Sequence, residues 1–309
     1  MTPRVWLFLP TYNEAENLEQ VVRATTRQLE SAAPGDWRLL VVDDDSPDGT
    51  GAIADRLAAE LPGVEVLHRP GTGGLGPAYL AGFGYGLERG AAVVIVMDAD
   101  FSHDPEHLPA MIAAAADSDL VIGSRYVQGG EIEDWPRLRR VLSRSGSLYA
   151  RLILGVKVHD LTSGFRAVRR PVLETIEPST LRAQGYVFNI ELTYRALLAG
   201  FTVAEVPICF RDRTLGQSKM SLPIAFEALG LVPRLRLLRR DAPRLRARKA
   251  EWQRGHRSGL AFPRWARRRG IRFDADAAGV VRHRLNGKLE GVEHAGRNGG
   301  SAAEPAEQR

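Results

Sequence analysis

An apolar run ends in two carboxylates at residues 93–103, VVIVMDADFSH. Side chains alternate along a β-strand, so Asp98 and Asp100 would project from the same face at the point where the strand ends. Two carboxylates this close repel each other unless they share a positive charge. A hard divalent cation, Mg²⁺ or Mn²⁺, bound to a diphosphate would supply that charge and stabilise the phosphate as it leaves. An exposed acidic turn is the alternative that this stretch alone leaves open.

The residues before this stretch alternate between β-rich runs and helical segments. Runs at residues 5–9, 38–42 and 64–67 predict strands, and the segments between them predict helices. This alternation is typical of an α/β domain with a mostly parallel, Rossmann-like sheet and helices on both faces. The polar segments TYNE (11–14) and DDDSPDGT (43–50) follow the first two strands. Ligands of such sheets bind beyond the carboxyl ends of the strands, so we expect the functional site there.

A glycine-rich turn in the stretch RPGTGGLGPAY (69–79) raises a competing hypothesis. Gly71, Gly73 and Gly76 spell G-x-G-x-x-G between a predicted strand and a predicted helix, which is the pattern of nicotinamide dehydrogenases. A dehydrogenase uses one acid after the next strand to bind a ribose. The second acid of VMDAD would then have no role, and both interpretations stay open at this point.

Composition bounds the class of protein. The chain has 309 residues, of which 44% are apolar and 26% charged, enough for the core of one large domain or two small ones. Its single cysteine, Cys209, excludes an internal disulfide and is expected to be a small buried residue rather than a nucleophile. No run approaches the roughly 20 apolar residues that cross a bilayer. The net charge of +5 favours an anionic partner: nucleic acid, a membrane surface or a phosphorylated substrate.

Two basic segments lie beyond the predicted sheet. Residues 136–154 place apolar side chains at helical spacing with arginines between them, and residues 229–249 again mix leucines with arginines. One such helix fits an ordinary surface as well as an interface, but two favour an anionic membrane surface. The polar end of the chain has too few apolar residues to offset the entropy of ordering, so we expect disorder there. We therefore divide the chain into residues 1–225, a basic amphipathic segment at 226–249 for a membrane or partner, and a partly disordered extension at 250–309.

Eight motifs in order give the chain a resemblance to a known family. PTYNE, DDDSPDGT, GLGPAY and DAD are followed by GSRY (123–126), DLTSGFRA (160–167), GYVFNIEL (185–192) and VPICFRDRTLGQSKMS (206–221). In this order they resemble family 2 glycosyltransferases of the GT-A fold, and within these the polyprenol (dolichol) phosphate mannose synthases. The match covers residues 5–221, so residues 1–225 are expected to be the catalytic domain. Similar enzymes carry Gly-Leu-Gly before a helix, which favours a turn over a dinucleotide cradle.

The resemblance implies roles for individual residues of this chain. The implied contacts of the guanine nucleotide are Pro10, Tyr12, Glu14, Val42 and Asp44. The metal and the donor diphosphate would be held by Asp98 and Asp100 beside Ala99, with Ser102 as third metal ligand where some relatives have Gln. The phosphates of donor and acceptor would be surrounded by Arg125, Arg213 and Lys219, and the acceptor phosphate also by Arg139 and Ser143. The catalytic residues are expected to be Asp98, Asp100 and Arg125.

The activity that the resemblance implies is inverting transfer of mannose from GDP-mannose to a polyprenyl monophosphate, with Mg²⁺ or Mn²⁺ as cofactor. The acceptor phosphate is already anionic near neutral pH, so no catalytic base is needed, and we expect a packing role for His103. The enzyme would be cytoplasmic and peripheral, on the inner face of the membrane. Many relatives have transmembrane helices after the catalytic domain, so a separate membrane-anchor protein is an expected partner.

Three alternatives remain. One is a family 2 transferase for another sugar nucleotide, such as UDP-glucose. The others are a nicotinamide dehydrogenase and a noncatalytic binder of nucleotide sugars or nucleic acid. Nucleic acid is not an expected partner, because no readout motif is present and the basic residues alternate with leucines rather than with stacking aromatics.

Overall fold

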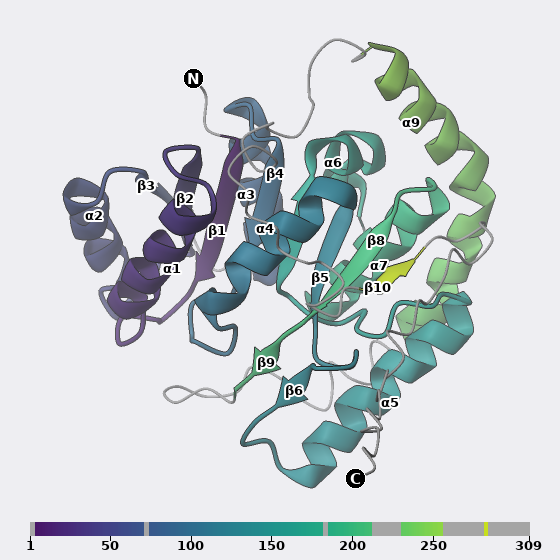
Figure 1. Cartoon of the computed structure of the whole chain (residues 1–309), viewed down its shortest axis with the longest axis horizontal. Helices are drawn as coiled ribbons and strands as arrows, with labels where there is room; N and C mark the ends of the chain where they lie inside the picture. The colour runs from purple at the N-terminus through teal and green to yellow at the C-terminus, as the bar shows by residue number, and fades with distance from the viewer. Residues whose placement is uncertain (1–3, 71–73, 182–184, 212–229, 256–280, 284–309) are drawn as a thin grey trace, which may run out of the picture.

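The computed structural model describes residues 4–70, 74–181, 185–211, 230–255 and 281–283. These form a sheet in the order β10-β8-β5-β7-β4-β1-β2-β3 and a small second sheet, β6-β9 (Figure 1). The strands of the large sheet are β1 (Val5–Thr11), β2 (Trp37–Asp43), β3 (Val64–His68), β4 (Val93–Val96), β5 (Leu120–Ser124), β7 (Arg166–Arg169), β8 (Val203–Pro207) and β10 (Val281–His283). The small sheet pairs β6 (Glu131–Ile132) with β9 (Cys209–Phe210).

The large sheet is mixed and mostly parallel, which confirms the predicted α/β architecture. β1 pairs in parallel with β2 and β4, β2 with β3, and β5 with β8. β7 runs antiparallel between β4 and β5, and β10 runs antiparallel to β8. Because β7 is antiparallel, its first residue, Arg166, pairs with Val96 and Ile122 near the carboxyl ends of β4 and β5. The segment that leads into β7 therefore reaches the edge where a ligand of this kind of sheet binds.

Helices cover both faces of the large sheet (Figure 1). They are α1 (Leu18–Ala32), α2 (Thr50–Glu60), α3 (Leu75–Glu88), α4 (Leu108–Asp117), α5 (Arg137–Leu154), α6 (Arg170–Ile176), α7 (Gly185–Leu198) and α9 (Ala242–Gly255). Short 3₁₀ helices are η1 (Pro105–His107), η2 (Pro178–Thr180) and η3 (Arg236–Asp241). The helices expected between the first strands and over residues 136–154 are all present.

The alternation of side chains along β1 divides the core into two layers. Trp6 and Phe8 lie in one hydrophobic cluster with buried residues of α3, α7 and α9. Val5, Leu7 and Leu9 lie in a second cluster with buried residues of α1, α2 and α4. Each such side chain stabilises the fold by roughly 1.5–3 kcal/mol. β1, whose carboxyl end reaches that edge, is therefore packed on both faces.

Helix α3 follows the glycine-rich turn, as the sequence predicted. Residues 71–73 of that turn lie outside the described ranges. Farther along the helix, a Cβ added at Gly82 would come within 2.8–2.9 Å of the Phe8 ring. Only glycine lets α3 lie this close to β1, so this glycine serves packing.

The basic segment after residue 229 packs on the domain that contains the large sheet (Figure 1). Val232, Leu235 and Leu245 are buried in the cluster that contains α7. Arg239 donates to the carbonyl oxygen of Leu154 at 2.9 Å, and Arg246 binds the carbonyl oxygen of Leu198 at 3.2 Å. Part of the apolar and basic character of residues 226–249 is thus used inside the protein, and α9 continues past the predicted boundary at residue 249. The role of this segment at a membrane or a partner stays a prediction.

Two further expectations concern the membrane and the end of the chain. Among the helices that the structure describes, none combines the length and the apolar character needed to span a bilayer. The expected disorder of the terminal extension concerns residues that lie outside the described ranges.

Candidate active site

The carboxyl ends of β4, β1 and β2 lie side by side at one edge of the sheet. Thr11 at the end of β1 is paired with Asp43 at the end of β2, and the Asp44 N–H donates to the Thr11 carbonyl oxygen at 3.1 Å. On the other side of β1, the Met97 N–H donates to the Phe8 carbonyl oxygen at 3.3 Å. The acidic segments after β2 and β4 therefore flank β1, as the alternation of strands and helices predicted.

Asp98 and Asp100 differ in exposure. The Asp98 side chain retains 31% of its accessible surface, whereas Asp100 is 1% exposed. Phe101 adopts a left-handed backbone, with φ of 58°, and turns the chain sharply. In this turn the N–H and the hydroxyl of Ser102 both donate to Oδ1 of Asp100, at 3.0 and 2.6 Å. Asp100 is thus fixed by its own turn, while Asp98 faces the solvent-accessible side.

His103 contacts both the backbone and the side chain of Asp98. Its Nδ1 accepts a hydrogen bond from the Asp98 N–H at 3.2 Å and lies 3.6 Å from the Asp98 carboxylate. The ring packs between Phe165 and Phe210, each with its centroid 5.3 Å away. Burial lowers the pKa of His103 despite the opposing charges of Asp98 and Asp100. The imidazole is therefore a neutral packing group, which agrees with the role expected for it.

A glycine in the segment before β7 lies against Asp98. A Cβ added at Gly164 would stand 3.2 Å from the Tyr79 hydroxyl and 3.6 Å from Oδ1 of Asp98. Tyr79 comes from α3 and is buried under the same edge. The DLTSGFRA motif therefore forms one wall of the site beside the carboxylate pair.

Two of the acids after β2 fix the turn, and a third pairs with an arginine. Asp43 accepts hydrogen bonds from the N–H and the hydroxyl of Ser46, at 3.2 and 2.6 Å. Asp48 accepts hydrogen bonds from the Thr50 hydroxyl at 2.6 Å and the Ala15 N–H at 3.0 Å. Burial opposes ionisation of Asp48, but these hydrogen bonds lower its pKa below the ordinary value. Asp44 forms a partly buried ion pair with Arg69, so the expected nucleotide contact lies beside a cation.

The other expected nucleotide contacts lie close to this turn. Pro10, Tyr12 and Glu14 are partly exposed, at or just after the end of β1. Val42 and Ala99 are buried, at 0% and 2% exposure. Their roles stay predictions.

Arg125 follows β5 and is held by a buried carboxylate. Its Nε and Nη2 donate to the two oxygens of Asp160, at 2.7 and 2.8 Å, and its backbone N–H donates to the same carboxylate at 3.1 Å. Nη2 also donates to the Thr162 hydroxyl at 2.8 Å. This bidentate pair fixes the plane of the guanidinium. The Arg125 side chain is therefore held in one orientation, and its contact with a phosphate stays a prediction.

Asp160 is positioned by a second buried carboxylate that the sequence analysis did not single out. Glu205, on β8, accepts hydrogen bonds from the N–H of Asp160 at 2.9 Å and from the N–H and Nδ1 of His159 at 2.8 and 3.0 Å. Arg166 donates hydrogen bonds to the carbonyl oxygens of Leu161 and Ser163 in the same segment. Burial lowers the pKa of Arg166 to about 10. An acid in the otherwise apolar run VAEVP was the available signal for Glu205.

Helix α5 brings the expected acceptor-phosphate residues next to Arg125. The Tyr126 hydroxyl donates to the Ser143 hydroxyl at 2.7 Å, which joins the end of β5 to α5. The Arg139 guanidinium lies 4.1 Å from the centre of the Trp135 ring, and Arg125 lies 5.8 Å from the same ring. Arg125, Arg139 and Ser143 therefore belong to one neighbourhood.

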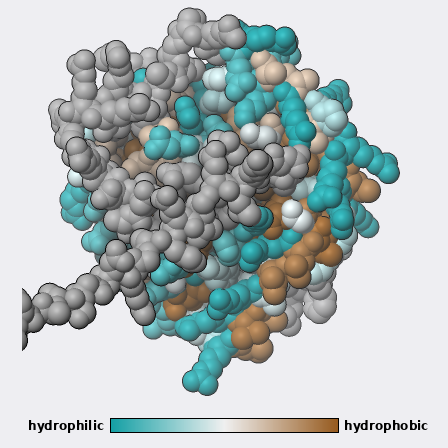
Figure 2. All heavy atoms as spheres, turned by 45° about the vertical axis from the view of Figure 1, so that its right-hand side comes forward, coloured by the Kyte–Doolittle hydropathy of each residue, from teal (hydrophilic) through white to brown (hydrophobic). Residues whose placement is uncertain are grey.

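The outer face of α5 is apolar and exposed. Its exposed apolar residues are Leu138, Val141, Leu142, Leu148 and Leu152, and only Ser147, Ala150 and Leu154 are buried. Figure 2, which turns this side of the molecule forward, shows hydrophobic side chains with hydrophilic ones between them. A surface helix packed on the core would bury its apolar face. The interfacial role of α5 stays a prediction.

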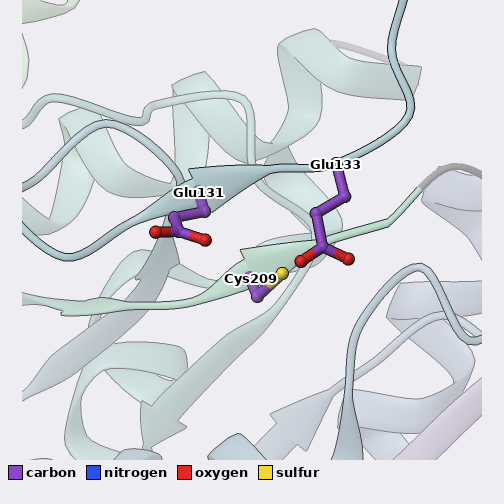
Figure 3. A group of neighbouring side chains, drawn as sticks. All are labelled: Glu131, Glu133 and Cys209. Carbon is purple, nitrogen blue, oxygen red and sulfur yellow. The ribbon is translucent and has the colours of Figure 1, made fainter.

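A different group of possible metal ligands lies in the small sheet. Within the described ranges, the group of three or more clustered His, Cys, Asp or Glu ligands is Glu131, Glu133 and Cys209 (Figure 3). Glu133 is already paired with Arg211 at 2.8 Å. Burial and the hydrogen bond to Glu133 raise the pKa of the Cys209 thiol to about 11, so it stays protonated. Cys209 is partly exposed rather than buried as we expected, because it lies in this short edge sheet and not in the core.

Two expected phosphate contacts, Arg213 and Lys219, lie outside the described residues.

Comparison with known proteins identifies the family. The family model described as glycosyl transferase family 2 matches residues 6–177. The chain belongs to glycosyltransferase family 2. The polyprenol monophosphomannose synthase of Mycolicibacterium smegmatis is 52% identical over 222 residues, 71% of this chain and 82% of that protein. The undecaprenyl-phosphate mannosyltransferase of Micrococcus luteus is 48% identical over 231 residues, 75% of this chain and 93% of that protein. The resemblance to polyprenol phosphate mannose synthases is confirmed.

Solved structures of glycosyltransferases share the fold. Mannosyl-3-phosphoglycerate synthase from Rubrobacter xylanophilus gives a TM-score of 0.53 at 18% identity, over 85% of this chain and 79% of that one. Glucosyl-3-phosphoglycerate synthase from Mycobacterium tuberculosis, in complex with Mg²⁺ and UDP, gives 0.52 at 19% identity, over 78% of this chain and 79% of that one. At these identities the likeness establishes the GT-A fold alone.

Proposed function

We propose that this glycosyltransferase moves mannose from GDP-mannose to a polyprenyl monophosphate, with inversion at the anomeric carbon. The observation that carries the proposal is that the Asp98/Asp100 turn and Arg125 meet at the Phe210 ring. His103, which contacts Asp98, lies 5.3 Å from the centre of this ring, and the Arg125 guanidinium lies 5.3 Å from it as well. The chain that builds this edge is 52% identical to a polyprenol monophosphomannose synthase.

The carboxylate pair is suited to a hard divalent cation. Asp98 and Asp100 offer oxygen ligands of the kind that Mg²⁺ and Mn²⁺ prefer. The neighbouring His103 is not a competing ligand, because its Nδ1 accepts the Asp98 N–H. A bound cation would neutralise charge on the donor diphosphate. Ser102 is fixed on Asp100 and is the proposed third contact.

Apart from the cation, the reaction needs the two substrates to be oriented and the charge of their phosphates to be stabilised. The bond between the anomeric carbon and the diphosphate breaks, and an oxygen of the acceptor phosphate forms the new bond, so no proton has to be removed. Arg125, fixed by Asp160, and Arg139 with Ser143 would hold the acceptor phosphate for attack from the side opposite the leaving group. GDP would leave as an anion, and Arg213 and Lys219 are the proposed contacts of its phosphates.

The lipid acceptor would require the enzyme to lie on a membrane. The exposed leucines of α5 would enter the interface while its arginines meet anionic headgroups, each worth about 1 kcal/mol when well placed. We therefore propose a peripheral position on the inner face of the cytoplasmic membrane, with a separate anchor protein as a candidate partner.

Purified protein with Mg²⁺, polyprenyl phosphate vesicles and labelled sugar nucleotides tests the proposal. We expect label from GDP-mannose in an organic-extractable lipid that mild acid hydrolyses, and none when Asp100→Asn replaces the wild type. Incorporation from UDP-glucose alone would overturn the choice of donor and support the alternative family 2 activity. Family membership already speaks against the dehydrogenase and the noncatalytic binder.

A further inference from the structure

Trp135, two residues before α5, has a buried polar atom without a partner among the residues that the structure describes. The residue is 7% exposed, and its Nε1 makes no hydrogen bond within those ranges. A buried N–H without an acceptor costs roughly 1–3 kcal/mol. Tryptophan usually finds a partner for this group when it is buried. A ligand atom is therefore the natural candidate for the missing acceptor.

The neighbours of Trp135 indicate the charge of that ligand. Arg139 lies 4.1 Å from the ring centre, Arg125 lies 5.8 Å from it, and the Phe210 ring packs edge-on at 5.3 Å. These neighbours donate hydrogen bonds or are apolar, and they leave the indole N–H without an acceptor. An anion would satisfy the indole and attract Arg139 together.

The start of α5 adds to this preference. The helix begins at Arg137, two residues after Trp135, and no side chain caps its first turn. The N-terminal N–H groups of a helix favour anions. The indole, the Arg139 side chain and the first turn of α5 are thus three kinds of donor in one place.

The Trp135 ring also connects the start of α5 with the Asp98/Asp100 pair. His103 contacts Asp98 and packs on Phe210, whose ring packs on Trp135. The rings of His103, Phe210 and Trp135 therefore form a continuous row of contacts between Asp98, the expected metal ligand, and Arg139. An anion beside Trp135 would occupy the acceptor side of the site, away from the nucleotide turn after β2.

We infer that the Trp135 indole N–H donates a hydrogen bond to the phosphate of the prenyl phosphate acceptor, making Trp135 a further acceptor-binding residue. This inference rests on the proposed function, because that function supplies the acceptor. Trp135 selects for an acceptor that carries a phosphate over the corresponding alcohol.

Two variants remove the N–H while keeping an aromatic ring. Trp135→Phe retains the contacts to Arg139 and Phe210, and replacement of Trp135 by 3-benzothienylalanine preserves the shape of the indole more closely. Trp252→Phe is the matched control, since it removes an indole N–H that donates to Glu174 on α6. Farnesyl phosphate is the probe, and farnesol is its control without phosphate. Titration calorimetry measures binding without relying on transfer.

We expect both Trp135 variants to weaken farnesyl phosphate binding about tenfold, the size of one lost hydrogen bond to a charged group. They should leave the dissociation constant of GDP-mannose unchanged, and Trp252→Phe should change neither constant. In steady state, the KM for the acceptor should rise more than kcat falls. Unchanged farnesyl phosphate binding in the benzothienylalanine protein, or no binding of this probe by the wild type, would overturn the inference. Binding that depends on Trp135 in a protein that transfers no mannose would instead refute only the proposed function.

Discussion

Replacing Asp160 by asparagine probes the buried ion pair that fixes Arg125. The carboxylate is 0% exposed and accepts from Nε of Arg125 at 2.7 Å and from Nη2 at 2.8 Å. Asparagine has almost the same volume, but it carries no charge and offers one acceptor oxygen instead of two. The Arg125 guanidinium then stays buried after losing its carboxylate partner.

The cost follows from the burial of both groups. Removing one partner of a buried ion pair destabilises a protein by about 3–5 kcal/mol. Asparagine still accepts one hydrogen bond, so we expect the lower end, about 3 kcal/mol. For a domain of this size, this corresponds to a fall in Tm of roughly 6–12 °C. The KM for prenyl phosphate should also rise, because the plane of the guanidinium is no longer fixed.

Guanidinium denaturation followed by circular dichroism measures the free energy of unfolding. The control is Glu19→Gln, which removes an exposed carboxylate that pairs with Arg23 at 2.9 Å and with Arg56 at 2.6 Å. Such surface pairs contribute little, so its midpoint should barely move. If Asp160→Asn unfolds at the same denaturant concentration as this control, the buried pair does not stabilise the edge as described.

Three further changes test other parts of the structure. Gly82→Ala should cost about 1–3 kcal/mol by overpacking against Phe8, whereas Gly84→Ala on the same helix, where a Cβ meets nothing within 4 Å, should not destabilise; equal denaturation midpoints would refute this packing. His107 accepts the Cys209 N–H at Nε2 (3.0 Å), and burial lowers its pKa, so the unfolded state binds the proton first. Stability should therefore fall as pH drops below about 6.5, and His107→Gln should flatten that part of the denaturation profile; an unchanged slope would contradict the assignment. Leu138→Ser with Leu152→Ser, both 71% exposed, should reduce cosedimentation with anionic vesicles without changing Tm, and undiminished cosedimentation would exclude α5 as the membrane contact.

Local patterns were sufficient to predict most of the strands, the helices and the edge that carries the site. The periodicity of β1 and α1 and the acids after β2 and β4 are properties of short segments, so they can be read from neighbouring residues. The entry of β7 between β4 and β5 is different, because it depends on pairing between distant segments that no local pattern encodes.

The same distinction applies to the site. Arg125 is separated from Asp160 by 35 residues and Asp160 from Glu205 by 45, so their network appears only when β5, β7 and β8 assemble. The amphipathic pattern of α5 predicted an apolar face, but it could not tell whether the core or the solvent receives that face. In the described structure the leucines of this face are exposed.

The dependence of mannosyl transfer on a divalent cation tests the central claim most directly. Transfer from GDP-mannose to polyprenyl phosphate is measured in excess chelator and again after Mg²⁺ or Mn²⁺ is added back, with Asp98→Asn and Asp100→Asn in parallel. We expect no transfer in chelator, recovery with either cation in the wild type, and no recovery in the Asp100 variant. Full turnover in excess chelator would contradict it.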